Sequence, residues 1–557
     1  MVSVTTTKPF SSPRGLPRKT ASICPECKNV IPAVLKEKDS MVIMEKTCKV
    51  HGYYWDIISR DVELYLRMEQ YARDGVAYEN PYYKIFKGCP TTCGMCDHHK
   101  SHTGLALMDL TNRCNLKCPV CFANANAAGY VYEPTFEQVK FMLKALRDQK
   151  PVPAVAVQFS GGEPTISPIF LDACQTAWDM GFSQIQVATN GIRFASSIEF
   201  VESAMKHHLH TIYLQFDGVD DSVYMQTRAV PLTRVKDKVV NNVRTVYNKY
   251  KGKNMKPPTI VLVPTIVNGF NEHQVVPILN YAIDNLDIVR GVNYQPVALT
   301  ARIPDNDRFS MRFTQSDLVR ILTTEGPFEK SDFFPVPSVA PISELIGILK
   351  GTPKMTLTTH PGCGLATFAF VNKDKKVIPL PRFMDVDGFF GKIQEIIDEY
   401  KNSKIRRIKT AYGALKLKTE ISKYFDFENA PDFLNKNNLL DVMSRIFSEG
   451  DKRPLSDFTW GALYVGAMHF QDSYDYDIQR LMRCDIHYTS PDGRIIPFCS
   501  YNSGPVYREE VEKKFSVPVE EWKKKVKSEN KKGVATIGVN GEVVVDSPVY
   551  SEIGEGK

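Results

Sequence analysis

Residues 104–122 read GLALMDLTNRCNLKCPVCF, an apolar strand-like segment followed at once by three cysteines. Cys114, Cys118 and Cys121 have C-x3-C-x2-C spacing on one tight loop. Three thiolates so placed hold a 4Fe-4S cluster and leave its fourth iron open to a molecule that takes an electron from it. The stretch therefore predicts a catalytic cluster. A structural zinc loop and a simple electron-transfer cluster are the alternatives.

A second motif follows at a short distance. Residues 155–159, VAVQF, read as a buried strand and end in Ser160-Gly161-Gly162-Glu163-Pro164. The two motifs in this order resemble the radical S-adenosylmethionine (SAM) superfamily, whose members reductively cleave SAM at the open iron to form a 5'-deoxyadenosyl radical. The resemblance implies that Gly161, Gly162 and Glu163 hold the amino group of SAM. Val120 departs from the pattern, because the superfamily usually has an aromatic residue there against adenine.

Apolar runs then recur at 184–189, 211–216, 260–266 and 289–297, with helical spacing between strands. With the strands around Leu107 and Val157 they make six. The resemblance implies an α/β fold, a partial (β/α)6 barrel of parallel strands with its chemistry at their carboxyl ends. Polar residues follow those ends and are predicted SAM contacts, although turn or cap roles explain each one equally well: Thr189, Asn190, Gln215, Asp217 and Gln295.

The remaining cysteines indicate further metal sites. Without a signal-peptide h-region, the thirteen cysteines are better explained as metal ligands than as disulfides. Cys24, Cys27 and Cys48, with His51 as the fourth ligand, predict one tetrahedral zinc or rubredoxin-like iron, and a purely structural role is the alternative. Cys174 has helical spacing within an apolar stretch and is predicted to lie in the core.

Two more triads are predicted to hold auxiliary 4Fe-4S clusters. Cys89, Cys93 and Cys96 repeat the C-x3-C-x2-C spacing, with His98, His99, His102 or a remote residue as the fourth ligand. The last triad is scattered along the chain, which leaves buried free thiols as its alternative: Cys363, Cys484 and Cys499.

Length and charge indicate a multidomain cytoplasmic enzyme. The chain has 557 residues and a formal charge of +7, with no apolar run near the ~20 residues of a membrane span. We expect no nucleic-acid partner. Between Phe389 and Phe425, apolar stripes run beside basic residues, which is compatible with peripheral contact at the inner face of the membrane. A solvated helix over a core explains the same pattern.

The order of cysteine motifs resembles more narrowly the archaeal tetraether lipid synthases, over roughly residues 23–503. This resemblance implies a rubredoxin-like iron, three 4Fe-4S clusters, and the coupling of terminal methyl carbons of isoprenoid chains in archaeol-type lipids. The substrate would be a long-chain isoprenoid lipid, and the electron donor is unidentified. The alternatives are a radical SAM methylase of a dihydropterin and a non-catalytic iron-sulfur carrier.

These expectations divide the chain into five parts. Residues 1–22 are a disordered tail, and 23–88 form a small rubredoxin-like or zinc-ribbon-like metal domain. Residues 89–103 form an auxiliary cluster segment and 104–300 the radical SAM core. A C-terminal α+β domain, 301–557, carries an auxiliary cluster and covers the substrate.

Overall fold

The computed structural model describes residues 14–547 except 83–87, 95, 254, 302, 304–306, 402–419, 433, 436, 438–461, 529–533 and 538–542. Its N-terminal unit is an antiparallel sheet in the order β1-β2-β3-β4. These strands are β1 (Arg18–Ile23), β2 (Val30–Lys38), β3 (Met41–Cys48) and β4 (Gly52–Ser59). Strand β1 begins at Arg18, whose buried side chain pairs with Glu69 and anchors β1 to α1 (Val62–Glu69). The expected disordered tail over residues 1–22 thus overlaps this strand from Arg18 onward.

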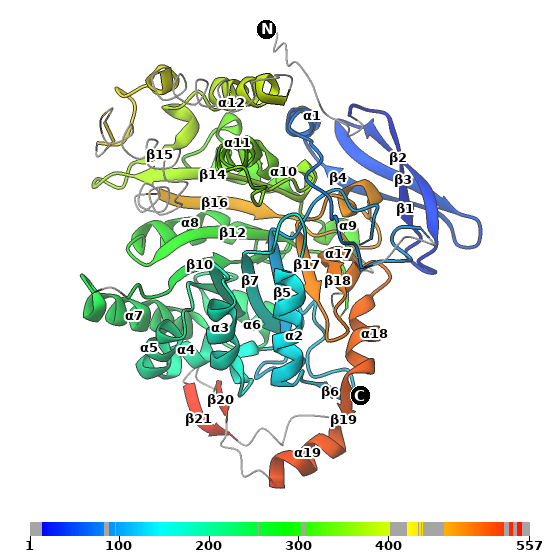
Figure 1. The fold of residues 1–557 in the computed structure, drawn as a ribbon, viewed down its shortest axis with the longest axis vertical. Helices are drawn as coiled ribbons and strands as arrows, with labels where there is room; N and C mark the ends of the chain where they lie inside the picture. The colour runs from blue at the N-terminus through cyan, green and yellow to red at the C-terminus, as the bar shows by residue number, and fades with distance from the viewer. Residues whose placement is uncertain are drawn as a thin grey trace.

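The sheet β1 to β4, residues 18–59, is called the ribbon below. The ribbon packs on the flank of the main body, beside β17 and β18 in Figure 1. Thr20 Oγ1 donates to Asp477 Oδ1 at 2.6 Å, and Lys46 Nζ donates to the carbonyl of Ser473 at 2.7 Å. Arg312, fully buried, bridges Asp56 of the ribbon and Asp472 at 2.7 Å each. A buried charge is tolerated only when it is paired, so these contacts hold the ribbon in one orientation.

The main body is built on eight consecutive parallel strands in the order β17-β5-β7-β8-β9-β10-β12-β16. The middle six are the strands expected from the sequence, and the predicted α/β fold is confirmed. Their bounds are β5 (Leu105–Thr111), β7 (Ala156–Gly161), β8 (Gln184–Thr189), β9 (Thr211–Gln215), β10 (Thr259–Val263) and β12 (Val289–Pro296), with β11 (Thr265–Ile266) beside β12.

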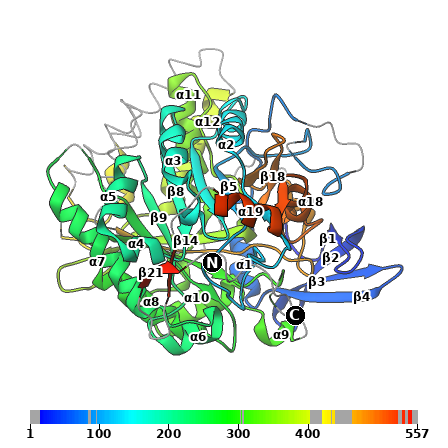
Figure 2. The same cartoon turned by 90° about the horizontal axis from the view of Figure 1, so that it is seen from below.

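Helices connect these strands and cover their outer face (Figures 1 and 2). In α7, Val235, Val239, Val243 and Val246 recur at helical spacing and are buried against the sheet. The connecting helices are α2 (Phe136–Arg147), α3 (Phe170–Asp179), α4 (Ile192–Ser196), α5 (Ile198–Lys206), α6 (Asp221–Arg228), α7 (Thr233–Tyr250) and α8 (Val275–Asp284). Cys174 in α3 is fully buried in this core.

The C-terminal segment adds one parallel strand to each edge of the six. β16 (Ala462–Met468) pairs with β12, and β17 (Ile486–Thr489) pairs with β5. The sequence did not predict these two additions. Antiparallel neighbours follow outward: β14 (Gly364–Val371), β13 (Phe334–Pro335) and β15 (Val377–Pro379) on one side, and β18 (Ile495–Pro497) on the other.

The other elements lie around this sheet. Two small pairs join β19 (Ser516–Pro518) to β6 (Tyr130–Tyr132), and β20 (Val534–Ile537) to β21 (Val543–Ser547). In the described part of the chain, the remaining α-helices are α9 (Arg308–Met311), α10 (Gln315–Thr324), α11 (Ala340–Lys350), α12 (Val386–Lys401), α16 (Ile478–Leu481), α17 (Phe498–Asn502), α18 (Tyr507–Lys514) and α19 (Val519–Ser528).

Part of the basic apolar stripe lies in α12. Its residues Ile393 and Ile396 are buried in a cluster that includes Leu345 of α11. The rest of the stripe falls largely on residues 402–419, outside the described residues. None of the helices in the described part of the chain combines the length and apolar composition of a membrane span.

Candidate active site and metal centres

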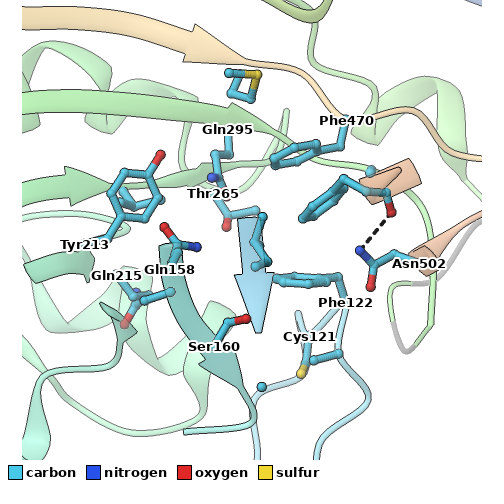
Figure 3. Close-up of a pocket in the computed structure, with 18 of the residues that line it drawn as sticks. Cys121, Phe122, Gln158, Ser160, Tyr213, Gln215, Thr265, Gln295, Phe470 and Asn502 are labelled. Carbon is cyan, nitrogen blue, oxygen red and sulfur yellow. Dashed lines mark hydrogen bonds between the residues drawn. The ribbon is translucent and has the colours of Figure 1, made fainter. Parts of the chain in front are cut away.

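A cavity of about 460 Å³ lies inside the barrel, between the strands and the loops at their carboxyl ends (Figure 3). Cys114, Cys118 and Cys121 line it together with Ser160 to Glu163. Of the polar residues predicted at the strand ends, four also line it: Thr189, Asn190, Gln215 and Gln295. The volume falls in the range of about 300–1,000 Å³ that is typical of small-molecule sites.

The cysteine loop follows β5 and is held by Asn126. The side-chain oxygen of Asn126 accepts a hydrogen bond from the Cys114 backbone N–H at 2.9 Å. The side-chain nitrogen of Asn126 donates to the carbonyls of Cys114 and Leu116 at 2.8 and 3.2 Å. Asn126 has a φ of 65°, a left-handed conformation that asparagine adopts more readily than most residues. These contacts fix the loop that carries the three thiols.

The Gly161-Gly162 turn packs directly on this loop. An added Cβ at Gly162 would lie 2.2 Å from the carbonyl oxygen of Arg113, and one at Gly161 would lie 2.1 Å from that of Thr111. Gly161 also has a φ of 128°. The backbone N–H groups of Gly162 and Glu163 donate to those same two carbonyls at 2.8 Å each. Only glycines allow so close an approach, and they bring Glu163 to the cysteines.

Glu163 connects the turn to the end of β8. Its carboxylate accepts from Thr189 Oγ1 and from the Asn190 backbone N–H, both at 2.8 Å, and from both polar groups of Thr165. The residue is 1% exposed, and burial raises the pKa of this carboxyl while the hydrogen bonds oppose the rise. The motif and two of the predicted strand-end residues, Thr189 and Asn190, therefore form one hydrogen-bonded unit.

Gln215 and Asp217, both at the end of β9, take different positions. Gln215 faces the cavity, and its oxygen accepts from the buried Lys236 Nζ at 2.8 Å. Asp217 is fully buried and makes two hydrogen bonds with Arg228, at 2.5 and 3.0 Å. Arg228 in turn donates to the carbonyl of Val120 at 2.9 Å. Asp217 thus braces the cysteine loop through Arg228, and it does not line the cavity.

The cavity thiols need a positive centre to ionise together. Burial raises the pKa of Cys114 well above its ordinary value, and negative charge on Cys118, Glu163 and Cys121 raises it further. Burial also raises the pKa of Cys118, against the opposing effect of Arg228. Thiolates, not thiols, bind metals, and a cationic cluster lowers their pKa values. Three thiols line this one cavity, an arrangement that fits a 4Fe-4S cluster.

The ribbon brings together four ligand atoms for one ion. Those of Cys24, Cys27, Cys48 and His51 lie within 4.8 Å of one another. Cys27 Sγ lies 3.9 Å from Cys48 Sγ, and His51 Nδ1 lies 3.6 Å from both Cys24 Sγ and Cys48 Sγ. A tetrahedral ion with ~2.3 Å metal–sulfur bonds needs ligand separations of about 3.8 Å. Hydrogen bonds from Val50 and His51 lower the pKa of Cys48 to about 6, which favours its thiolate.

Cys89, Cys93 and Cys96 line a small cavity with His98 and His99. Burial raises the pKa of Cys93 to about 12 and that of Cys89 well above its ordinary value. Both ring nitrogens of His102 are used elsewhere, at 3.3 Å from the carbonyl of Val76 and at 3.0 Å from the backbone N–H of Thr356. Among the three candidate histidines, His98 and His99 are thus the ones beside the thiols.

The scattered triad also comes together. Cys363 precedes β14, Cys484 precedes β17, and Cys499 lies in α17. Burial raises the pKa of Cys484, and negative charge on Cys499 and Cys363 raises it further. Burial likewise raises the pKa of Cys499 to about 12, and the positive charge of the buried Arg480 opposes that rise. Residues 136 positions apart in the chain are thus neighbours.

Comparison with known proteins identifies the chain. Residues 16–60 match the HMPTM N-terminal zinc ribbon domain, and residues 108–282 match the Radical SAM superfamily. The 7,8-dihydro-6-hydroxymethylpterin dimethyltransferase of Methanocaldococcus jannaschii is 42% identical over 509 residues, covering 91% of this chain and 97% of that one. This chain belongs to the same family. Membership in the radical SAM superfamily implies a 4Fe-4S cluster and SAM, and the ribbon match supports an N-terminal metal site.

Two further matches cover less of this chain. A GTP 3',8-cyclase of Clostridium acetobutylicum is 23% identical, over 41% of this chain and 68% of that one. Streptococcus suis SuiB bound to its precursor peptide SuiA is 13% identical with a TM-score of 0.30, over 54% of this chain and 68% of that one.

The expected lipid-coupling function is wrong. A relative that spans 91% of this chain is a pterin dimethyltransferase, not a tetraether lipid synthase, so the isoprenoid lipid substrate is contradicted as well. The error has a physical reason. The cysteine motifs and the Gly161 to Glu163 turn position metals and SAM, and they carry no information on which molecule occupies the rest of the cavity.

Sequence reasoning missed three supporting residues: Asn126, Arg228 and Lys236. Asn126 lies twelve residues after Cys114, and its left-handed backbone leaves no periodic signal. Arg228 and Lys236 lie on the helices after β9, at positions that read as ordinary helix ends and faces. A signal existed for Lys236, because this charged residue lies at helical spacing within the valine stripe of α7.

Proposed function

We propose that this protein is a radical SAM methyltransferase of a dihydropterin, with 7,8-dihydro-6-hydroxymethylpterin as the substrate. The observation that carries the proposal is the 42% identity to the named dimethyltransferase across 97% of that protein's length. The amide and hydroxyl groups in the cavity lining agree with a small heterocyclic substrate. The net reaction replaces a C–H bond of the substrate by C–CH3, twice for a dimethyltransferase.

Within this proposal, different cavity residues bind the cluster and SAM. Cys114, Cys118 and Cys121 hold the cluster, and Gly162 and Glu163 present hydrogen-bond acceptors to the amino group of SAM. The bound cluster and SAM supply one-electron chemistry at carbon atoms that acid and base groups do not activate. Lys236, by donating to Gln215 and to the Asn190 carbonyl at 2.7 Å, fixes the orientation of the Gln215 amide.

We further propose two auxiliary 4Fe-4S clusters and one mononuclear ion. Cys89, Cys93 and Cys96 would hold one cluster, and Cys363, Cys484 and Cys499 the other. The ion would be zinc or iron at Cys24, Cys27, Cys48 and His51. The buried thiols with raised pKa values support metal binding at both triads, because uncompensated thiolates there would repel one another. Metal analysis of anaerobically prepared protein should give about 12 cluster irons per chain.

The test is an anaerobic reaction of reconstituted protein with SAM, a strong reductant and 7,8-dihydro-6-hydroxymethylpterin, followed by mass spectrometry. We expect the pterin to gain one and then two methyl groups, together with 5'-deoxyadenosine. SAM carrying a deuterated methyl group identifies the carbon source, because label in the product assigns it to SAM. Formation of 5'-deoxyadenosine with an unchanged pterin, in the presence of candidate methyl donors, would contradict the proposal.

A further inference from the structure

A second set of polar side chains lines the cavity deeper in the barrel. Gln158, Tyr213 and Asn293 each stand two residues before a lining residue at a strand end, on β7, β9 and β12. Side chains two apart on a strand share a face, and a rise of ~3.3 Å per residue puts them about 7 Å further in. We call these three residues the inner layer. The outer layer comprises the cysteine loop, Gly161 to Glu163, Thr189 and Asn190.

The inner layer offers hydrogen-bonding groups to a ligand. Asn293 is 6% exposed, and its Nδ2 donates to the hydroxyl of Tyr213. Its Oδ1 is buried and has no hydrogen-bond partner among the described residues. Gln186 Nε2 donates to Gln158 Oε1 at 2.7 Å, which turns the amide nitrogen of Gln158 to other partners. A buried acceptor without a partner is costly, so Asn293 Oδ1 indicates a donor on the missing molecule.

Aromatic rings stand across the cavity from these groups. In Figure 3, Tyr213 and Gln158 lie on one side, and Phe470 and Phe122 lie on the other. Phe470 stacks on Phe498 with ring centroids 3.7 Å apart and an angle of 18° between the planes. Phe122 is 40% exposed although it lines the cavity. The cavity thus combines a polar edge with flat apolar faces, which suits a planar heterocycle.

We infer that the inner layer binds the pyrimidine edge of the pterin, with Asn293 Oδ1 accepting from its 2-amino group. This inference rests on the proposed function and names the residues that select the substrate. Tyr213 and the Gln158 amide nitrogen are donors for the 4-oxo group, while Phe470 or Phe122 packs on the ring face. A long alkyl chain has no donor for Asn293, which separates this inner layer from an apolar lipid tunnel.

The test compares two ligands on the reconstituted holoenzyme with SAM. The oxidised probe 6-hydroxymethylpterin has the 2-amino group, and 6-hydroxymethyllumazine has an oxygen in its place. Dissociation constants are measured anaerobically from the quenching of ligand fluorescence. We expect the wild-type protein to prefer the pterin about tenfold, the effect of one hydrogen bond to a buried group. Asn293→Leu should bind the two ligands alike.

The preference is a ratio, so it does not depend on the fraction of folded protein. Asn241→Leu, on the exposed face of α7, is the matched control and should keep the wild-type preference. Tyr213→Phe is a second variant, expected to weaken binding of both ligands by a similar factor. Retention of the wild-type preference in Asn293→Leu would overturn the inference alone. Failure of the wild-type protein to bind or methylate any pterin would overturn the proposed function instead.

Discussion

The outer and inner layers of the cavity differ in how they are built. The outer layer is held by backbone contacts that only particular residues allow, such as the approach of Gly162 to the Arg113 carbonyl. The inner layer is a set of side chains on regular strands, where many residue types fit the same backbone. One barrel can therefore keep the outer layer and change its substrate through the inner layer. This difference explains why motifs identify the reaction class and fail to identify the substrate.

The largest effect is expected in the outer layer, from Cys118→Ala. Removing one cluster ligand should reduce SAM cleavage to the background of the assay and lower the iron content by about four per chain. Iron analysis and 5'-deoxyadenosine formation measure the two effects. Cys174→Ala, in the α3 core, is the control with unchanged iron. Full SAM cleavage by Cys118→Ala would remove this loop from the catalytic site.

Gly162→Ala should act through geometry alone. Its new Cβ would lie 2.2 Å from a backbone oxygen, so the turn must shift and SAM cleavage should fall about a hundredfold. Gly391→Ala in α12 is the matched control, since a Cβ there meets no atom within 4 Å. That variant should keep activity and gain about 0.5–1 kcal/mol in helix stability. Equal activity of both variants would show that the close approach is unimportant.

Lys236, which donates to the Asn190 carbonyl of the outer layer, makes the stability of the protein depend on pH. Burial lowers its pKa to about 7 in the folded protein, against 10.5 for the free side chain. Between these values the unfolded chain binds more protons, so the contribution of this group to stability rises with pH above 7 and is constant below it. In the wild-type protein, this group should raise the free energy of unfolding by about 2 kcal/mol between pH 7 and pH 9, and Lys236→Met should remove that rise. Denaturant titrations at pH 7 and 9 measure it, with the exposed Lys238→Met as the control.

The smallest effect on SAM cleavage in the barrel is expected from a substitution in the ribbon. His51→Ala should lower the zinc or iron content by about one ion per chain while SAM cleavage changes less than about twofold. Metal analysis with His273→Ala, an exposed histidine, as the control checks this. Loss of SAM cleavage in His51→Ala would mean that the ribbon ion takes part in the barrel chemistry.

The sequence predicted the features that are local in the chain. The six central strands, the cysteine loop and the grouping of Cys24, Cys27, Cys48 and His51 depend on spacing within short segments. The added strands β16 and β17 could not be predicted, because short strands are defined by the partners they pair with. The spacing along the strands could have predicted the inner layer, because side chains two residues apart share a face of a strand. Gln158 lies two residues before Ser160, and Asn293 lies two residues before the predicted contact Gln295.

The most direct test is an anaerobic structure of the reconstituted protein with SAM and 6-hydroxymethylpterin. The account predicts the heterocycle inside the barrel, its 2-amino nitrogen about 2.9 Å from Asn293 Oδ1 and its ring face against Phe470 or Phe122. A pterin bound outside the barrel, with Asn293 Oδ1 still lacking a partner, would contradict the division of the cavity into a cofactor layer and a substrate layer.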